Sequence, residues 1–205
     1  MKQKELRVGM AIAGVLLSGI CVGVFQKIAL GTDPFTCFVT GIANLFGSAY
    51  STYYVILTGI LLLIIFFVHR AYIGLATIIN LLGIGVIADW MRCFLDVLMP
   101  APGMEIRLIL LVVNVALASF AASLYFTADL GVSAYDAVAL AAANPYGWAD
   151  FRYCRITTDI LCVMVGFFYA ADIGIGTVLT AFMMGPIIQW FNVNLSEPLL
   201  AACNT

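Results

Sequence analysis

The chain has 205 residues, of which 64% are hydrophobic and only 10% charged, with a formal net charge of −2. A soluble domain carries about 25% charged residues, so the composition excludes a water-soluble globular protein, and the net charge argues against a nucleic-acid partner. Spanning helices need about 20 apolar residues. Long windows without Asp, Glu, Lys or Arg cover 8–26, 34–69, 71–88, 108–128 and 173–196. We therefore predict an all-α membrane protein whose surroundings are the lipid bilayer.

The first predicted helix covers 8–26 and follows the positive charges of Lys2, Lys4 and Arg7, which favour a cytoplasmic amino terminus. A short helix is predicted over 34–46, because Asp33 is a good N-cap and Pro34 suits the first helical position. That helix is roughly 20 Å long, whereas the hydrocarbon core is about 30 Å thick. Helices over 51–68 and 73–90 complete the first half.

The second half resembles the first at an offset of 100 residues. From Gly14 to Met91, 21 of the 78 positions are identical to their partners without a gap. Such self-similarity indicates a duplicated unit. We predict about eight hydrophobic helices, two of them short, in two homologous four-helix repeats over 8–91 and 108–191, with a linker over 92–107 and a short polar tail over 192–205.

The second short helix, over 134–144, starts differently from the first. Ser133 takes the cap position and Asp136 follows three residues later, which is a capping-box pattern. The remaining helices of this half are predicted over 108–127, 151–170 and 173–191. Two different caps at equivalent positions favour a helix start in both halves.

Two topologies fit this pattern. If all eight helices cross, seven Lys and Arg residues lie on the side of the termini and two on the other side. If the two short helices are re-entrant, six helices cross, the repeats are inverted, and the count is six against three. The charge count favours eight spans and a linker on the cytoplasmic side, whereas the length of the short helices favours re-entry. Both termini are cytoplasmic in either case.

Catalytic motifs are absent from the sequence, which has one histidine and no paired-cysteine, P-loop or nucleophile-elbow pattern. We therefore expect no enzyme activity, no cofactor and no metal site. The six cysteines lie mostly in apolar segments, where a thiol behaves as a small hydrophobe.

The capped turns are the first candidate binding site. Asp33, Ser133 and Asp136 stand at the amino ends of the short helices, where partial positive charge and free N–H groups can hold a solute. Plain helix capping explains the same residues without any ligand. Asn44 and Asn144 occupy equivalent positions and either line a pathway or bond neighbouring helices.

The second candidate is a charged face of the helix over 151–170. Arg152, Arg155 and Asp159 are spaced so that they share one face. Charges at membrane depth are costly and either pair with one another or face a cavity. An Arg155–Asp159 ion pair and a site for solute or a coupling proton are the two interpretations. The first half has Val55 and Gly59 at the positions equivalent to Arg155 and Asp159.

The motifs Leu-Gly-Thr-Asp-Pro-Phe and Leu-Gly-Val-Ser-Ala-Tyr-Asp-Ala, with Gly-Ile-Gly-Thr and Gly-Pro near the last helix, resemble the YczE/YyaS/YitT family of bacterial integral membrane proteins. The resemblance covers nearly the whole chain. It implies a bacterial plasma membrane and no particular activity or site residue.

These features lead to two functional hypotheses. The first is a transporter or permease-like protein for a small molecule or ion, which requires that Asp33, Asp136, Asp159 and Asn144 converge on one cavity. The alternative is a non-transporting accessory or scaffold protein, in which these side chains can be scattered. The sequence predicts neither the substrate nor the oligomeric state.

Overall fold

The computed structural model describes residues 2–143 and 151–202, and all regular secondary structure in these ranges is helical. The elements in chain order are α1 (Lys2–Ile28), α2 (Pro34–Phe46), α3 (Tyr50–His69), the 3₁₀ turn η1 (Arg70–Tyr72), α4 (Leu75–Leu98), α5 (Met104–Ala128), α6 (Ala134–Ala143), α7 (Phe151–Phe168), α8 (Ile175–Phe191), the π-helical turn η2 (Asn192–Ser196) and α9 (Glu197–Ala202). The first eight α-helices correspond to the eight predicted ones.

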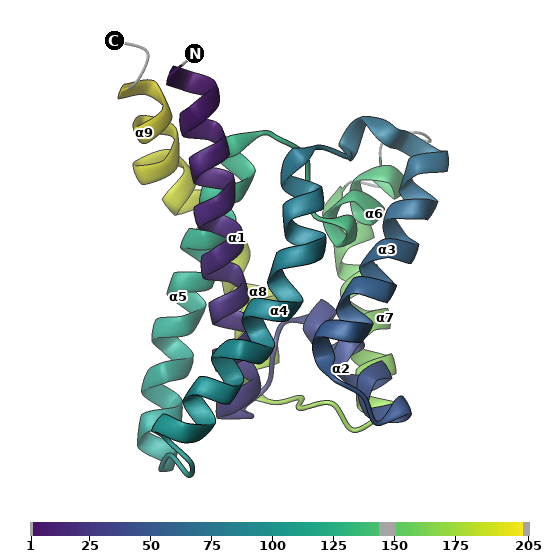
Figure 1. Cartoon of the computed structure of the whole chain (residues 1–205), viewed down its shortest axis with the longest axis vertical. Coiled ribbons are helices and arrows are strands. Elements are labelled where there is room, and N and C mark those ends of the chain that lie inside the picture. Colours follow the sequence, from purple (N-terminus) through teal and green to yellow (C-terminus); the bar gives the residue numbers. More distant parts are fainter. Residues whose placement is uncertain (1, 144–150, 203–205) are drawn as a thin grey trace.

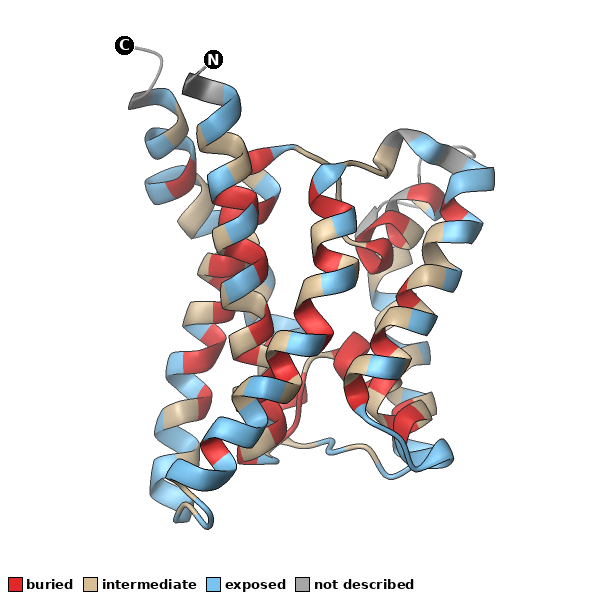
Figure 2. Ribbon diagram, in the orientation of Figure 1, coloured by how far each residue is buried: buried red, intermediate tan, exposed pale blue. Residues whose placement is uncertain are grey.

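Within the described residues, five helical segments are long and apolar enough to cross a membrane: Lys4–Ile28, Tyr50–Val68, Leu75–Leu98, Met104–Ala128 and Ile175–Ala201. Their outward faces carry large exposed apolar side chains, among them Phe67, Val97 and Phe182. Figure 2 shows the exposed residues on the outside of the helices and the buried ones turned inward. Apolar side chains that face outward suit lipid rather than water. The prediction of an all-α, multi-pass membrane protein is confirmed.

The start of α2 follows the predicted capping chemistry. Asp33 has extended backbone (φ −63°, ψ 156°), and its Oδ2 accepts a hydrogen bond from Thr36 N at 3.0 Å. Pro34 follows at the first helical position, where its missing N–H is not needed. At the other end, Gly47 adopts φ 62° and its N–H bonds the carbonyls of Ala43 and Asn44. The helix therefore has the predicted bounds of 34–46.

Several helices extend beyond their predicted bounds. α4 continues to Leu98, so the linker predicted over 92–107 begins as helix. The helix passes Asp96, whose Oδ1 lies 2.6 Å from Lys27 Nζ, and ends before Pro100, because the residue preceding a proline disfavours helical backbone. The tail predicted over 192–205 continues from α8 as η2 and α9. Ser196 in this tail is buried, and its Oγ lies 2.5 Å from Ser123 Oγ.

α1 and α5 pack against each other in antiparallel orientation (Figure 1). A Cβ placed on Gly14 would lie 2.8 Å from the carbonyl oxygen of Ala121, so only a glycine allows this approach. Further along the same interface, Asn114 Nδ2 donates to the carbonyl oxygen of Cys21 at 2.9 Å. An offset of 100 residues converts the pair 14 and 121 into the pair 114 and 21. The two contacts are therefore reciprocal.

Arginines tie the two ends of this helix pair. Arg107 Nε donates to the carbonyl oxygen of Ile28 at 2.5 Å, and its Nη2 donates to that of Ala29 at 3.0 Å. Arg7 Nη1 donates to the carbonyl oxygen of Ala128 at 3.2 Å. Each arginine satisfies carbonyls at the carboxyl end of the other helix, where a cation is favoured. Position 7 and position 28 correspond to positions 107 and 128, so these contacts are reciprocal too.

The turns before the short helices make a third reciprocal pair of contacts. Gly31 has φ +107° and Gly131 has φ +109°. A Cβ on Gly31 would lie 2.7 Å from Gly174 N, and a Cβ on Gly131 would lie 2.5 Å from Gly74 N. The carbonyl oxygens next to these glycines accept from backbone amides of the opposite half: Gly176 N donates to Leu30 O at 2.8 Å and Ala76 N donates to Leu130 O at 3.0 Å.

Each short helix packs on a long helix of the other half: α2 lies against α7, and α6 lies against α3. At the first of these crossings, a Cβ on Gly41 would lie 2.9 Å from Gly166 Cα. In Figure 1, α2 and α6 begin near the middle of the molecule and run toward opposite ends. Neither crosses from one end to the other.

Both termini lie at one end of the molecule, and the turn between α4 and α5 lies at the opposite end (Figure 1). This arrangement differs from the expectation that the linker over 92–107 shares the side of the termini. The physical reason is that α2 is too short to return the chain across the molecule. α1, α3 and α4 therefore bring the chain to the far end, where α5 begins.

Candidate functional site

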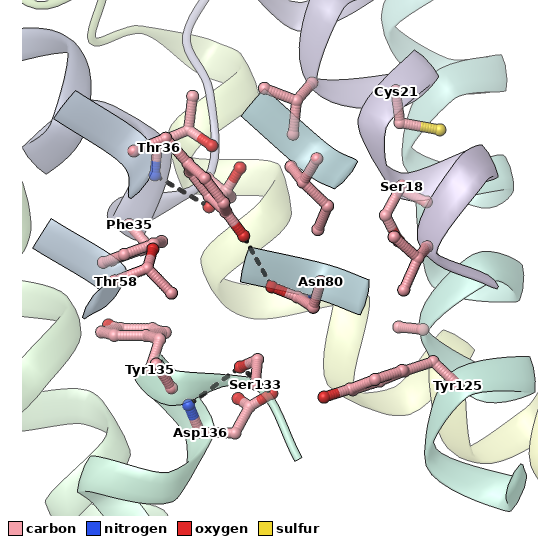
Figure 3. Close-up of a pocket in the computed structure, with 18 of the residues that line it drawn as sticks. Ser18, Cys21, Phe35, Thr36, Thr58, Asn80, Tyr125, Ser133, Tyr135 and Asp136 are labelled. Carbon is pink, nitrogen blue, oxygen red and sulfur yellow. Dashed lines mark hydrogen bonds between the residues drawn. The ribbon is translucent and has the colours of Figure 1, made fainter. Parts of the chain in front are cut away.

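A cavity of about 170 Å³ lies where the amino ends of α2 and α6 meet α1, α3, α4 and α5. Its wall includes Asp33 and Thr36 from the first half, and Ser133, Asp136 and Arg155 from the second. Figure 3 shows Thr36 and Asp136 entering the same space from different helices. The carboxyl ends of the two short helices do not contribute to the wall. The cavity is thus built around two helix amino ends.

The α6 end of the cavity is organised by Ser133. Its Oγ accepts a hydrogen bond from Asp136 N at 3.0 Å and donates one to Asp136 Oδ2 at 2.7 Å. The first contact caps the helix, as the sequence pattern predicts. The second fixes the Asp136 carboxylate beside the cavity (Figure 3), where it remains 13% exposed.

Arg155 joins two carboxylates into one network. Its guanidinium forms an ion pair with Asp136 through Nη1, and its Nε lies 3.3 Å from Asp159 Oδ1. Asp159 also accepts a hydrogen bond from the Tyr135 hydroxyl. The guanidinium carbon lies 4.4 Å from the centre of the Tyr135 ring, a separation at which a cation and a ring attract. The network couples α7 to the start of α6.

Aromatic rings form one side of the cavity. Phe35 and Tyr135 stack with centroids 5.0 Å apart and an interplanar angle of 21°. Tyr54 meets Phe35 edge-on, with centroids 6.0 Å apart. Phe35 and Tyr135 occupy equivalent positions in the two halves, so the stack lies where the halves meet.

Several hydroxyl groups at the cavity have no protein partner. Tyr54 Oη donates to Asn80 Oδ1 at 2.7 Å. By contrast, the buried hydroxyls of Tyr50, Thr58 and Tyr125 have no hydrogen-bond partner in the described part of the chain. Figure 3 shows the Tyr125 hydroxyl pointing from α5 into the cavity toward Ser133. A buried hydroxyl without a partner is costly, so these groups are suited to contact an occupant of the cavity.

The structure brings together some of the predicted site residues and separates others. Asp33, Ser133, Asp136 and Arg155 line the cavity, and Asp159 touches it through Arg155 and Tyr135. Asn44 lies elsewhere: its Nδ2 donates to the carbonyl oxygen of Ala170 at 3.0 Å, near the carboxyl end of α2. Asn144 and the side chain of Arg152 lie outside the described residues.

The sequence analysis missed the aromatic and hydroxyl lining. Tyr50, Tyr54 and Tyr125 belong to helices that are apolar on every face, so periodicity alone does not show which face is turned inward. A signal was nevertheless present in the sequence similarity at an offset of 100 residues. The cavity wall takes residues from equivalent positions of both halves: Phe25 and Tyr125, Asp33 and Ser133, Phe35 and Tyr135.

A family model matches residues 6–193 of this chain, which is most of its length, and is described as a family of unknown function, DUF6198. The chain belongs to this family. The family match and the similarity to a YczE membrane protein together support a YczE-like membrane protein, so the resemblance is confirmed. No solved structure matches the chain.

Two relatives cover most of this DUF6198 chain. An uncharacterized protein of Haemophilus influenzae is 26% identical over 175 residues, which are 84% of this chain and 77% of the relative. The uncharacterized membrane protein YczE of Bacillus subtilis is 24% identical over 176 residues, which are 86% of this chain and 80% of the relative. Both matches are long enough to include the two capped turns and the helices between them.

Proposed function

We propose that this DUF6198 protein is a small-solute transporter of the cell membrane. The observation that carries the proposal is that two short helices begin at one central cavity and run toward opposite ends. Transporters built from inverted repeats bind solute where the ends of such half-helices meet near the middle of the bilayer. Asp33, Asp136 and Arg155 supply charged groups at that place.

The proposal includes two inverted repeats, one in each half of the chain. The reciprocal contacts of α1 with α5, of Arg7 and Arg107, and of Gly31 and Gly131 support it. In each case, exchanging the halves converts one contact into the other. Because α1 and α5 are antiparallel, the axis that relates the halves runs across these helices rather than along them. Such a pair of halves can expose the central cavity to each side of the membrane in turn.

Charge supports a cytoplasmic location for both termini. With α2 and α6 re-entrant, the sequence count is six Lys and Arg residues on the side of the termini and three on the side of the α4–α5 turn, or five against three without Arg155, which lies at the cavity. Positive residues favour the cytoplasmic side. The proposal is therefore a plasma-membrane protein with six crossings and its α4–α5 turn outside.

Access to Cys21 tests transport without knowledge of the solute. Cys21 lines the cavity and is only 1% exposed. In a variant that keeps Cys21 and replaces the other five cysteines, a permanently charged methanethiosulfonate is applied to right-side-out and to inside-out vesicles. A transporter that alternates between two open states predicts reaction of Cys21 in both preparations.

The matched control carries Pro102→Cys as its single cysteine, in the turn between α4 and α5. It must react in one vesicle orientation and not in the other, which shows that the vesicles are sealed and oriented. Reaction of Cys21 from one side alone, or from neither, contradicts transport and favours the accessory-protein hypothesis.

A further inference from the structure

The charges at the cavity do not balance. Asp33, Asp136 and Asp159 bring three carboxylates to the cavity and its edge, whereas Arg155 brings the one guanidinium that the described residues place there. The amino ends of α2 and α6 each add about half a positive charge. The sum remains negative, so the site as folded attracts a cation rather than an anion.

Arg155 is not available for an anion. It contacts Asp136 and Asp159 and lies over the Tyr135 ring. An anion at the guanidinium would have to displace carboxylates that are already in place. The positive group of the cavity is therefore neutralised by the protein itself.

Asp33, unlike Arg155, has no partner of opposite charge among the described residues. Its Oδ2 accepts the Thr36 amide, and no Lys or Arg of the described chain lies within ion-pair distance of it. It lines the cavity across from Asp136. A carboxylate at membrane depth without a partner is costly, and a bound cation would remove that cost.

Other groups of the cavity wall also suit a cation. The hydroxyls of Tyr50, Thr58 and Tyr125 are more than nine-tenths buried, have no partner and can accept N–H donors. The rings of Phe35 and Tyr54 present aromatic surface beside them. Aromatic faces attract ammonium groups, more strongly when water is excluded.

The dimensions limit the size of the occupant. A cavity of about 150 Å³ holds a benzene molecule, and the cavity here measures about 170 Å³. We propose that this cavity binds a small organic cation, with its ammonium group between Asp33 and the unpartnered hydroxyls and its hydrocarbon part against Phe35 and Tyr54. The inference names the substrate class of the proposed transporter and rests on that function for its biological role.

Binding can be measured at equilibrium in detergent, so the test does not require transport. The probes are n-butylammonium, n-butanol and n-butyrate, which share a four-carbon chain and differ in charge. Each is added to the purified protein at the same concentration, sodium chloride is run as a fourth probe, and the protein without any probe is the reference. A ligand that binds only the folded protein raises the melting temperature. We expect n-butylammonium to raise it by a few degrees, in a saturable manner, and the other probes to leave it unchanged.

Asp33→Asn is the decisive variant. Asparagine caps a helix as well as aspartate does, so the start of α2 is retained while the charge is lost. We expect this variant to fold and to lose the response to n-butylammonium. Asp96→Asn is the matched control, because Asp96 pairs with Lys27 on the outside of the protein, away from the cavity. It should keep the full response.

Arg155→Gln separates the cation site from an anion site. Removing the guanidinium frees Asp136 and Asp159, so the response to n-butylammonium should persist or grow. If n-butyrate stabilises the protein and Arg155→Gln abolishes that stabilisation, the site binds an anion and the inference is overturned. The proposal of transport would remain, because Cys21 access tests it separately. Equal stabilisation by sodium would replace the organic cation with an inorganic one, and no response to any probe would also overturn the inference.

Discussion

The amino ends of α2 and α6 reach the cavity with nearly the same backbone and with different chemistry. The preceding glycines share φ values of +107° and +109° and contact equivalent residues of the opposite half. In the first half Asp33 caps the helix alone, whereas in the second Ser133 is the cap and Asp136 pairs with Arg155. The fold therefore needs the glycine and a cap at both places.

The charged network belongs to one half alone. Val55 and Gly59 stand at the positions equivalent to Arg155 and Asp159, and α3 forms as regularly as α7. A helix at this place does not require charge in order to fold. We infer that the difference between the halves reflects binding chemistry and that their shared contacts reflect architecture.

The largest effect is expected at the glycines shared by both halves. Gly31→Ala and Gly131→Ala each force a Cβ into backbone of the other half at positive φ. Strain and overpacking together should lower the free energy of unfolding by about 2–4 kcal/mol in each variant. Thermal unfolding in detergent measures this. Gly59→Ala is the control, because a Cβ there meets nothing within 4 Å. A large loss in one variant and none in the other would break the equivalence of the halves.

The charged network should show the next largest effect, in the second half only. Asp159→Asn leaves Arg155 with one carboxylate instead of two. Breaking a fully buried pair costs about 3–5 kcal/mol. Because Asp159 is 19% exposed and Asp136 remains, we expect about 1–3 kcal/mol, and adding Arg155→Gln should restore part of the loss. Additive losses in the double variant would show that the two side chains do not act as a pair.

The arginine contacts should differ moderately between the halves. Arg107 donates to two carbonyls, whereas Arg7 donates to one and lies 3.6 Å from the exposed carboxylate of Asp129. We expect Arg107→Gln to cost about 1–2 kcal/mol, since hydrogen bonds from charged donors are strong, and Arg7→Gln to cost less. Melting temperatures of the two variants give the order, and a reversed order would contradict it.

The smallest effect is expected at the caps. Ser133→Ala removes the acceptor for Asp136 N and should cost about 1 kcal/mol. Asp33→Asn should cost almost nothing, because asparagine accepts the same bond from Thr36 N. The melting temperatures of the two variants, measured side by side, test whether each residue stabilises the fold by capping its helix or by its charge. Equal losses would mean that the Asp33 charge also holds the fold.

Local chemistry explains which parts of the fold could be predicted from the sequence. The start of α2 at Pro34 and of α6 at Ala134 depends on neighbouring residues, so both were correct. The extension of α4 to Leu98 brings Asp96 beside Lys27, which is distant in the sequence. A charged residue in such a helix cannot be distinguished from a linker residue without that contact.

The site was only partly predictable for a related reason. Asp136 and Arg155 stand out as charges in apolar segments, and they do meet at the cavity. Tyr125 has no such signal, because α5 is apolar on all faces and its inward direction depends on how α1 packs against it. Asn44 carried a signal from the duplication, yet it lies near the end of α2 that is remote from the cavity.

The opposite orientation of the two halves is tested most directly by labelling in intact cells. Glu5→Cys marks the end with the termini and Pro102→Cys marks the α4–α5 turn, each in a background without the native cysteines. Inverted halves predict that an impermeant thiol reagent labels the variant at position 102 from outside and labels the variant at position 5 only after the membrane is opened. Labelling of both positions from the same side would contradict the proposal that the two halves are inverted. It would also contradict the proposal that the central cavity opens to each side of the membrane in turn.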